Sequence, residues 1–310
     1  MAFLEVKDLQ VYFPIKGGIL NRTVDHIRAV DGVSFELEQG KTYGLVGESG
    51  SGKSTTGRAI IGLEDVTSGQ VLFNGKDVTD KKAKTKDFRK DVQMIFQDPY
   101  SSLNPRKRVL DIVAEPLRNY EKLSKLEERK RVQELLDIVN VSSDSIFKYP
   151  HEFSGGQRQR IGIARAIALK PKLIIADEPV SALDVSVQAQ VLNFLQEIQK
   201  ELNLTYLFIS HDLGVVKHMC DNISIMYKGR YVEQGSTKDI FENPQHIYTK
   251  RLIAAIPDID PKNRERQFKF RQEIAKEYRE SYDRYFDGNG LAFGLQSISS
   301  THKVALPEKG

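Results

Sequence analysis

The sequence predicts an α/β fold in which a mostly parallel sheet is surrounded by helices. In the second half of the chain, short apolar segments alternate with amphipathic helices, and this alternation is typical of a parallel sheet. A glycine-rich segment lies between a short apolar strand and a helix. Further strand patterns near the N-terminus indicate a small antiparallel sheet. The expected strands are residues 3–6, 29–37, 43–46, 69–75, 172–176 and 205–210, and the clearest helix spans residues 186–202.

The glycine-rich segment fits the pattern G-x-x-x-x-G-K-[ST] of a phosphate-binding P-loop. Its glycines let backbone N–H groups turn inward, and the following helix adds partial positive charge. Lys53 can reach the β- and γ-phosphates, and the Ser54 hydroxyl can bind Mg²⁺. A flexible loop that merely precedes a helix would not explain Lys-Ser at the helix start. The motif predicts an NTPase and leaves kinases, GTPases and motor ATPases open. The residues expected to hold the nucleotide here are Gly47, Glu48, Ser49, Gly50, Ser51, Gly52, Lys53, Ser54 and Thr55.

The remaining segments connect or flank this core. Residues 14–26 are expected to form a long polar loop. Residues 109–141 have the charged, amphipathic pattern of helices. Residues 262–287 are charged and helix-prone, and residues 288–310 are expected to be a loose tail. No internal repeat is visible, so a single copy of the nucleotide-binding unit is expected.

Composition limits the class of protein. The chain has 310 residues, of which 40% are hydrophobic and 28% charged, so it is expected to be soluble with a substantial core. It lacks an apolar run of membrane-spanning length, and its N-terminus does not resemble a signal peptide. The single cysteine, Cys220, excludes an internal disulfide and a cysteine-rich metal site, which fits the cytosol. A net charge of +4 without a long basic stripe does not favour nucleic-acid binding.

A second anion-binding motif stands at Ser154-Gly155-Gly156-Gln157. A small hydroxyl and two glycines open a helix there, so free N–H groups and the helix dipole face the same point. An ordinary serine cap followed by flexible glycines is the alternative. That alternative does not explain why a chain with a P-loop carries a second helix start of this kind.

Ser154–Gln157 resembles the signature sequence of ABC-type ATPases. In that family two cassettes pair head to tail, and each ATP lies between the P-loop of one chain and the signature of the other. The resemblance implies an ABC-type P-loop ATPase core with an antiparallel β subdomain and an inserted α-helical subdomain. It implies a cassette over residues 1–257, with the helical subdomain at about 99–165, and a charged helical C-terminal extension and tail over 258–310.

Other motifs match the same family. Residues 173–178 resemble its Walker B strand, which implies that Asp177 holds Mg²⁺ and that Glu178 activates the attacking water. Ser181–Asp184 resembles the D-loop, so Asp184 is expected at the interface between the two cassettes. With Lys53, Gln97 and His211 added, every position that the family uses in hydrolysis is filled in this sequence.

Three further positions are implied by the resemblance. Gln97 resembles the Q-loop glutamine, which touches Mg²⁺ and water, and His211 resembles the switch histidine that contacts the γ-phosphate. A lone histidine is usually structural, but its place at a strand end beside Asp212 favours the functional role. Phe13 stands where the family has an aromatic residue stacked on adenine, and the neighbouring Tyr12 competes for this role.

Two segments resemble the oligopeptide/dipeptide importer ATPases. Residues 97–106 are similar to the segment after their Q-loop, and residues 243–250 resemble their His-Pro-Tyr-Thr-Lys ending, with Ile247 in place of the proline. One subunit type of these importers often carries a cysteine cluster, which a chain with Cys220 alone cannot supply. The resemblance is therefore to the other subunit, the OppF type.

This resemblance implies an ATP-hydrolysing subunit that uses ATP and Mg²⁺ and drives uptake of oligopeptides or dipeptides. Its implied partners are a second ABC ATPase subunit in a heterodimer, two integral membrane permease subunits and, indirectly, an extracytoplasmic peptide-binding protein. Its implied location is the cytoplasmic face of the cell membrane, with no nucleic acid bound. The alternatives are a soluble ABC ATPase acting on nucleic acid or ribosomes, a subunit that binds ATP only to hold an assembly together, and an importer of another solute such as nickel.

Overall fold

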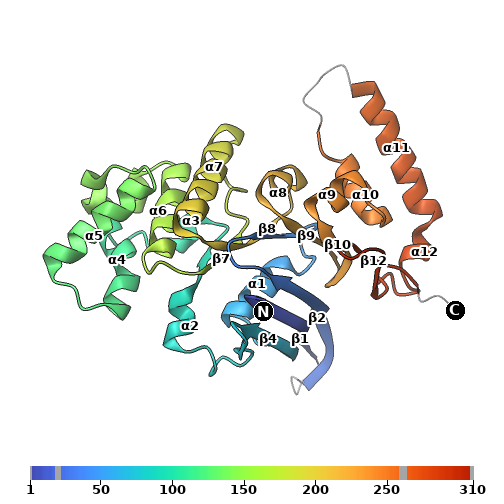
Figure 1. Ribbon diagram of the computed structural model, residues 1–310, viewed down its shortest axis with the longest axis horizontal. Coiled ribbons are helices and arrows are strands. Elements are labelled where there is room, and N and C mark those ends of the chain that lie inside the picture. Colours follow the sequence, from blue (N-terminus) through green and yellow to red (C-terminus); the bar gives the residue numbers. More distant parts are fainter. Residues whose placement is uncertain (1, 18–21, 258–263, 308–310) are drawn as a thin grey trace. The chain divides into compact units, whose positions relative to one another are not determined.

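The structure is a computed structural model that describes residues 2–17, 22–257 and 264–307 (Figure 1). The chain divides into two compact units. The first consists of Met1–Leu37, Thr42–Lys81 and Ser210–Gly310, and the second of Glu38–Lys41 and Lys82–Ile209. Each unit has its own strands and helices, and each holds part of the predicted site.

An antiparallel sheet forms the N-terminal part of the first unit, as predicted. Its strands are arranged in the order β2-β1-β4-β5. Val6 pairs with Phe35 on one side and with Val71 on the other, and these three side chains are buried. The alternation of buried and exposed residues therefore gives the sheet one apolar face. The strands are β1 (Leu4–Gly17), β2 (Arg22–Leu37), β4 (Ser68–Phe73) and β5 (Lys76–Asp77).

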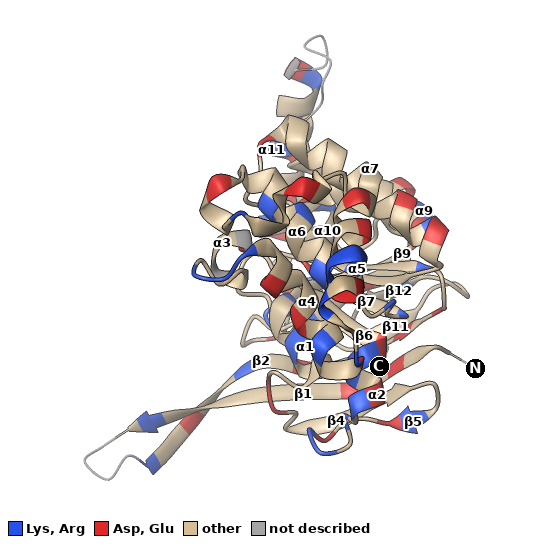
Figure 2. Ribbon diagram, turned by 90° about the vertical axis from the view of Figure 1, so that its left-hand side faces the viewer, with Lys and Arg blue, Asp and Glu red and all other residues tan. Residues whose placement is uncertain are grey.

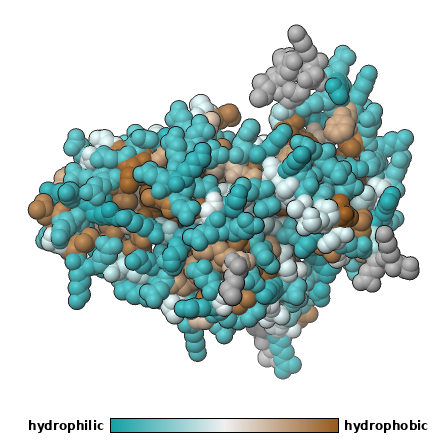
Figure 3. Space-filling model, in the orientation of Figure 1, coloured by the Kyte–Doolittle hydropathy of each residue, from teal (hydrophilic) through white to brown (hydrophobic). Residues whose placement is uncertain are grey.

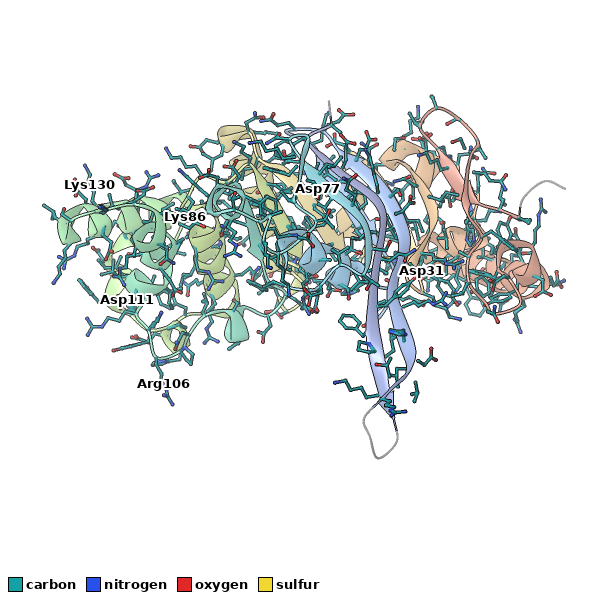
Figure 4. The ribbon with its side chains drawn as sticks, turned by 90° about the horizontal axis from the view of Figure 1, so that it is seen from below. Asp31, Asp77, Lys86, Arg106, Asp111 and Lys130 are labelled. Atoms are coloured by element: carbon teal, nitrogen blue, oxygen red, sulfur yellow. The ribbon has the colours of Figure 1, made fainter. Side chains whose placement is uncertain are left out.

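The prediction of a polar loop over residues 14–26 is wrong. β1 and β2 continue as a two-stranded ribbon in which Pro14 pairs with His26 and Gly17 with Arg22. Figure 4 shows this ribbon running well beyond Asp31, and Figure 2 shows acidic and basic residues near its outer end. Main-chain pairing holds such a ribbon, so its sequence needs no apolar alternation. Residues 18–21 lie outside the described part of the chain.

The first unit also contains a mixed sheet with the strand order β11-β12-β10-β9-β3. β3 and β9 are parallel, and the pairs among β9, β10, β12 and β11 are antiparallel. Its strands are β3 (Thr42–Val46), β9 (Asn222–Tyr227), β10 (Arg230–Ser236), β11 (Leu295–Ser297) and β12 (Lys303–Ala305). Its helices are α1 (Lys53–Ile61), α8 (Leu213–Met219), α9 (Thr237–Glu242), α10 (Ile247–Ala254), α11 (Arg264–Glu280) and α12 (Tyr282–Tyr285).

The prediction of a loose tail over residues 288–310 is also wrong for the part that the structure describes, which ends at residue 307. β12 adds to the edge of the sheet at β10, and its residues Val304 and Ala305 are fully buried. A buried polar contact of 2.7 Å joins Nε2 of His302 to the carboxylate of Glu233 in β10. The charged helix expected before this tail is present as α11, which lies along α10 (Figure 1).

The second unit contains three parallel strands, β6 (Val92–Ile95), β7 (Leu173–Asp177) and β8 (Thr205–Ser210), with β7 in the middle. α4, α5 and α6 contact one another and form the core of a helical region (Figure 1). The helical stretch expected over residues 109–141 is two helices, because a capping box of Ser124 and Glu127 starts α5 afresh. The helices are α2 (Lys86–Asp91), α3 (Pro99–Ser102), α4 (Val109–Tyr120), α5 (Lys125–Ile138), α6 (Gly155–Ile167) and α7 (Val185–Leu202), with short 3₁₀ turns at Ser143–Phe147 and Pro150–Glu152.

The visible surface is mostly hydrophilic (Figure 3). Strongly exposed apolar side chains include Leu126 and Val185, at 76% and 82% exposure, and isolated examples of this kind are common on soluble proteins. Across the described ranges, none of the helices combines the length and apolarity that a membrane crossing requires.

Candidate functional site

The backbone of the P-loop requires glycine at defined positions. A Cβ at Gly47 would lie 2.2 Å from the carbonyl oxygen of Met226, and a Cβ at Gly52 would lie 2.1 Å from that of Ala29. The φ angles of Gly50 and Gly52 are +78° and +108°, in the region that L side chains rarely adopt. The loop therefore curls tightly between the end of β3 and the start of α1, against the strands that carry Ala29 and Met226.

Lys53, the first residue of α1, turns its side chain back into this loop. The side chain is buried, and Nζ donates a hydrogen bond of 2.9 Å to the carbonyl oxygen of Glu48. Ser54 and Thr55 follow in the first turn, where both residues are half-buried. An ammonium group enclosed by a glycine-rich loop at a helix N-terminus matches the charge and donor pattern that phosphate groups need.

The two candidate adenine-stacking residues have different surroundings. The Tyr12 hydroxyl donates to Asp31, and the Arg28 guanidinium lies 5.6 Å from the centre of the Tyr12 ring. Tyr12 is therefore held within the sheet. Phe13 pairs with Ile27 and, like Tyr12, is half-buried.

His211 follows β8 directly and is exposed. The neighbouring Asp212 is the N-cap of α8, and its Oδ1 accepts hydrogen bonds from the N–H groups of Gly214 (2.7 Å) and Val215 (3.3 Å). Asp212 therefore has a local structural role, which fixes the chain next to His211.

In the second unit, Asp177 ends the central strand of the parallel sheet. All five residues of β7 are buried, and Asp177 itself is 0% exposed. Ligand sites of open parallel sheets lie at the carboxyl ends of their strands, where Asp177 is placed. Burying a carboxylate costs free energy unless cations or hydrogen-bond donors compensate it, so this position suits a metal ligand.

Glu178 has a strained backbone and a defined partner. Its φ is +46°, a conformation that is uncommon for residues other than glycine and that often marks functional sites. The amide nitrogen Nε2 of Gln97 donates a hydrogen bond of 2.8 Å to its Oε2. Gln97 comes shortly after the end of β6, the strand beside β7. The structure therefore brings the two predicted residues together at the same sheet edge.

The signature residues Ser154–Gln157 form the start of α6. Ser154 and Gln157 make a capping box, in which Ser154 Oγ accepts from the N–H of Gln157 (3.3 Å) and Gln157 Oε1 accepts from the N–H of Ser154 (3.0 Å). The cap uses these two amides and leaves the first helical amides, of Gly155 and Gly156, outside the helical bonding pattern. The serine is thus a cap, as the simpler interpretation expected, at a helix start that still offers donors to an anion.

The same helix start packs against the beginning of α7. A Cβ at Gly156 would lie 2.5 Å from Cγ1 of Val187, and one at Gly155 would lie 3.5 Å from Cδ2 of Leu183. Asp184, the N-cap of α7, is exposed. The close approach of Val187 explains why residue 156 is glycine. The contact with Leu183 places the Ser181–Asp184 loop beside the signature residues.

The predicted site residues are divided between the two units. Phe13, the loop from Gly47 to Thr55 and His211 belong to the first unit. Gln97, Ser154, Gly155, Gly156, Gln157, Asp177, Glu178 and Asp184 belong to the second unit. Two residues beside the P-loop were not predicted as part of the site: Tyr248 and Arg251 of α10 both contact Glu48. Only a tertiary structure reveals these contacts, because the residues are about two hundred positions apart.

Two sequence families match the chain. The ABC transporter family matches residues 30–181, which include the P-loop, Gln97, the signature residues and Glu178. The C-terminal region of oligopeptide/dipeptide transporters matches residues 232–282, from β10 through α11 into the start of α12.

Named relatives cover nearly the whole chain. The oligopeptide transport ATP-binding protein OppF of Lactococcus lactis subsp. lactis is 56% identical over 99% of this chain and 97% of its own length. OppF of Bacillus subtilis is 50% identical over 98% of this chain and 96% of its own length.

Solved structures with the same fold are ATP-binding cassettes. CbiO1 from Clostridium perfringens, part of the ABC transporter complex CbiONQ, has a TM-score of 0.66 and 30% identity over 81% of this chain and 95% of its own. The dimeric cassette MJ0796 in a post-hydrolysis state with ADP and Pi has a TM-score of 0.67 and 28% identity over 76% of this chain and 98% of its own. The chain therefore belongs to the ATP-binding proteins of ABC transporters, within the oligopeptide/dipeptide transporter family.

Proposed function

We propose that this chain is the ATP-hydrolysing subunit of an ABC importer, and that it couples ATP hydrolysis to the uptake of oligopeptides or dipeptides. The observation that carries the proposal is the 56% identity to an oligopeptide transport ATP-binding protein, which extends over 99% of the chain. The glycine-dependent P-loop and the contact between Gln97 and Glu178 support the same activity.

The P-loop would bind the phosphates of ATP. Backbone N–H groups of the loop from Gly47 to Thr55, other than that of Glu48, would donate to the phosphate oxygens, while Lys53 would exchange its bond to Glu48 for the β- and γ-phosphates. Phe13 would stack on the adenine. Tyr12 is the weaker candidate for that role because Asp31 and Arg28 already engage it.

Mg²⁺ prefers oxygen ligands. The buried Asp177 carboxylate, the Ser54 hydroxyl and the Gln97 amide oxygen would supply them. When bound, the ion would neutralise charge on the phosphate oxygens. Asp177, Ser54 and Gln97 would fix its position.

Glu178 would orient the attacking water and accept its proton. The hydrogen bond from Gln97 would help to hold its carboxylate in place, and the positive φ sets the direction in which the side chain leaves the main chain. His211 would donate to the γ-phosphate as negative charge develops there. Since no side chain needs to form a bond to phosphorus, the rate would come from positioning and charge stabilisation.

Complete sites would need a second cassette. Ser154–Gln157 would face the γ-phosphate of an ATP held by the partner's P-loop, and Asp184 would lie at the same interface. The dimeric cassette MJ0796 with ADP and Pi supports paired cassettes. We infer a heterodimer with a related ATPase subunit, bound to two membrane permease subunits at the cytoplasmic face and served by an extracytoplasmic peptide-binding protein.

We assign residues 1–257 to the ABC cassette, with its helical subdomain at about 99–165, and residues 258–310 to a C-terminal extension. The mutual contacts of α4, α5 and α6 support the helical subdomain.

The function is tested by purifying the chain with the membrane and ATPase subunits that copurify with it, and measuring ATP-driven uptake into vesicles. Glu178→Gln should lower ATP hydrolysis at least about 100-fold while ATP binding is retained, because the amide cannot accept a proton. Glu197→Gln, at an exposed site on α7, is the matched control and should behave like the wild type. Rapid hydrolysis by Glu178→Gln would exclude Glu178 as the base. Copurification with ribosomes or nucleic acid, or uptake of nickel instead of peptides, would favour the alternatives.

A further inference from the structure

Helix α10 contacts the P-loop through two of its residues. The hydroxyl oxygen of Tyr248 accepts a hydrogen bond of 3.3 Å from the backbone N–H of Glu48. Arg251, one turn later, pairs with the Glu48 carboxylate at 3.3 Å. The ion pair is exposed and therefore weak. The hydrogen bond is more informative, because it holds the main chain of the phosphate-binding loop itself.

The Tyr248 ring is held rigidly where its hydroxyl meets the loop. The residue is 0% exposed, and its ring centre lies 4.7 Å from that of Tyr227. Tyr227 in turn packs against Phe286, after α12, at 5.1 Å. Burial also raises the pKa of Tyr248, so its hydroxyl stays neutral. A fixed ring presents a fixed acceptor to the loop.

Helix α11 packs against α10 and holds it in place. Lys250 pairs with Glu277 at 3.1 Å, and Nε of Arg271 donates a hydrogen bond of 2.8 Å to the carbonyl oxygen of Ala254. The position of α10, and with it that of Tyr248, therefore depends on residues that follow the P-loop by more than two hundred positions.

We propose that Tyr248 is a positioning residue for ATP binding, which holds the P-loop in its phosphate-binding shape from outside. At the start of the loop, Gly47 lies against the Met226 carbonyl, and the next amide is held by Tyr248. Together these contacts hold the main chain at the point where the glycine-rich turn begins. A loop with this much glycine has little rigidity of its own, so outside support reduces the entropy lost when phosphate binds. This inference rests on the proposed ATP-binding function.

The test measures ATP affinity of the full-length chain by calorimetry in the presence of Mg²⁺. Tyr248→Phe keeps the ring and removes the acceptor, and we expect the Kd for ATP to rise about 5-fold, the effect of one lost hydrogen bond. Tyr206→Phe is the matched control. Tyr206 is also 0% exposed, and its hydroxyl donates at 3.2 Å to a main-chain oxygen, that of Leu195, so both partners belong to the second unit and neither belongs to α10 or the P-loop. Its Kd should equal that of the wild type.

A positioning role also predicts a specific kinetic pattern in the assembled transporter. Tyr248→Phe should raise the KM for ATP by a similar factor and leave kcat within about 2-fold, because the hydroxyl contacts the main chain of the loop and has no part in the proposed chemical step. The inference is overturned if Tyr248→Phe binds ATP like the wild type, or if both variants weaken binding equally. A wild-type chain that does not bind ATP would contradict the proposed function instead.

Discussion

The buried pair of Glu233 and His302 gives the sharpest stability prediction. Glu233 is 0% exposed, and its carboxylate accepts hydrogen bonds from the N–H groups of Gln245 (2.7 Å) and His246 (3.0 Å). His302 Nε2 lies 2.7 Å from the same carboxylate. This cluster joins β10, the start of α10 and the residue before β12. The substitution His302→Ala removes one of its three partners.

The cost of this change follows from burial. Removing one partner of a buried hydrogen bond leaves the other group unsatisfied, which costs about 1–3 kcal/mol and more when that group is charged. Two main-chain donors still reach Glu233, so we expect a loss of about 3 kcal/mol. For a unit of this size, each kcal/mol shifts the melting temperature by about 2–4 °C. The melting temperature of the first unit should therefore be about 6–12 °C lower in His302→Ala than in the wild type.

Scanning calorimetry of the full-length chain measures this shift. His26→Ala is the control, because His26 is exposed on the ribbon of β1 and β2, and its loss should change stability by less than about 0.5 kcal/mol. Equal melting temperatures for His302→Ala and His26→Ala would refute the docking of β11 and β12 described above.

Two further predictions concern nucleotide and pH. Lys53→Ala should weaken ATP binding at least about 10-fold, since it removes a charge-assisted contact to phosphate, and calorimetry that finds unchanged affinity would remove the P-loop assignment. Burial lowers the pKa of His246 to about 3, so the unfolded chain binds the extra proton below about pH 6.5 and the folded chain does not. The stability that this difference confers is complete above pH 6.5 and is lost as the pH falls toward 3, by about 2 kcal/mol at pH 5. His246→Asn keeps a cap for α10 but cannot titrate, so urea unfolding of this variant should depend less on pH over this range; an unchanged dependence would contradict the assignment.

The nucleotide-binding motifs were predictable because their chemistry is local in the sequence. Gly47 and Gly52 occur where neighbouring backbone leaves no room for a Cβ, and the P-loop pattern demands glycine at both positions. β7 was recognisable as an apolar run that ends at Asp177, and α6 as a helix opened by serine and two glycines. The parallel strands and the antiparallel N-terminal sheet followed from the same patterns.

Features that depend on distant contacts were not predictable. Residues 22–28 carry no alternation of apolar residues, although they pair with β1 over the whole outer ribbon. β12 has only three residues, and its attachment depends on Glu233, sixty-nine positions before His302. The positive φ of Glu178 likewise has no signature in a sequence that reads as an ordinary strand end.

The most direct test is the structure of the assembled transporter carrying Glu178→Gln with ATP and Mg²⁺ bound. We predict that Ser154–Gln157 donates hydrogen bonds to the γ-phosphate of an ATP held by the P-loop of the partner subunit. A nucleotide-loaded assembly in which this helix start lies far from every phosphate would contradict the account.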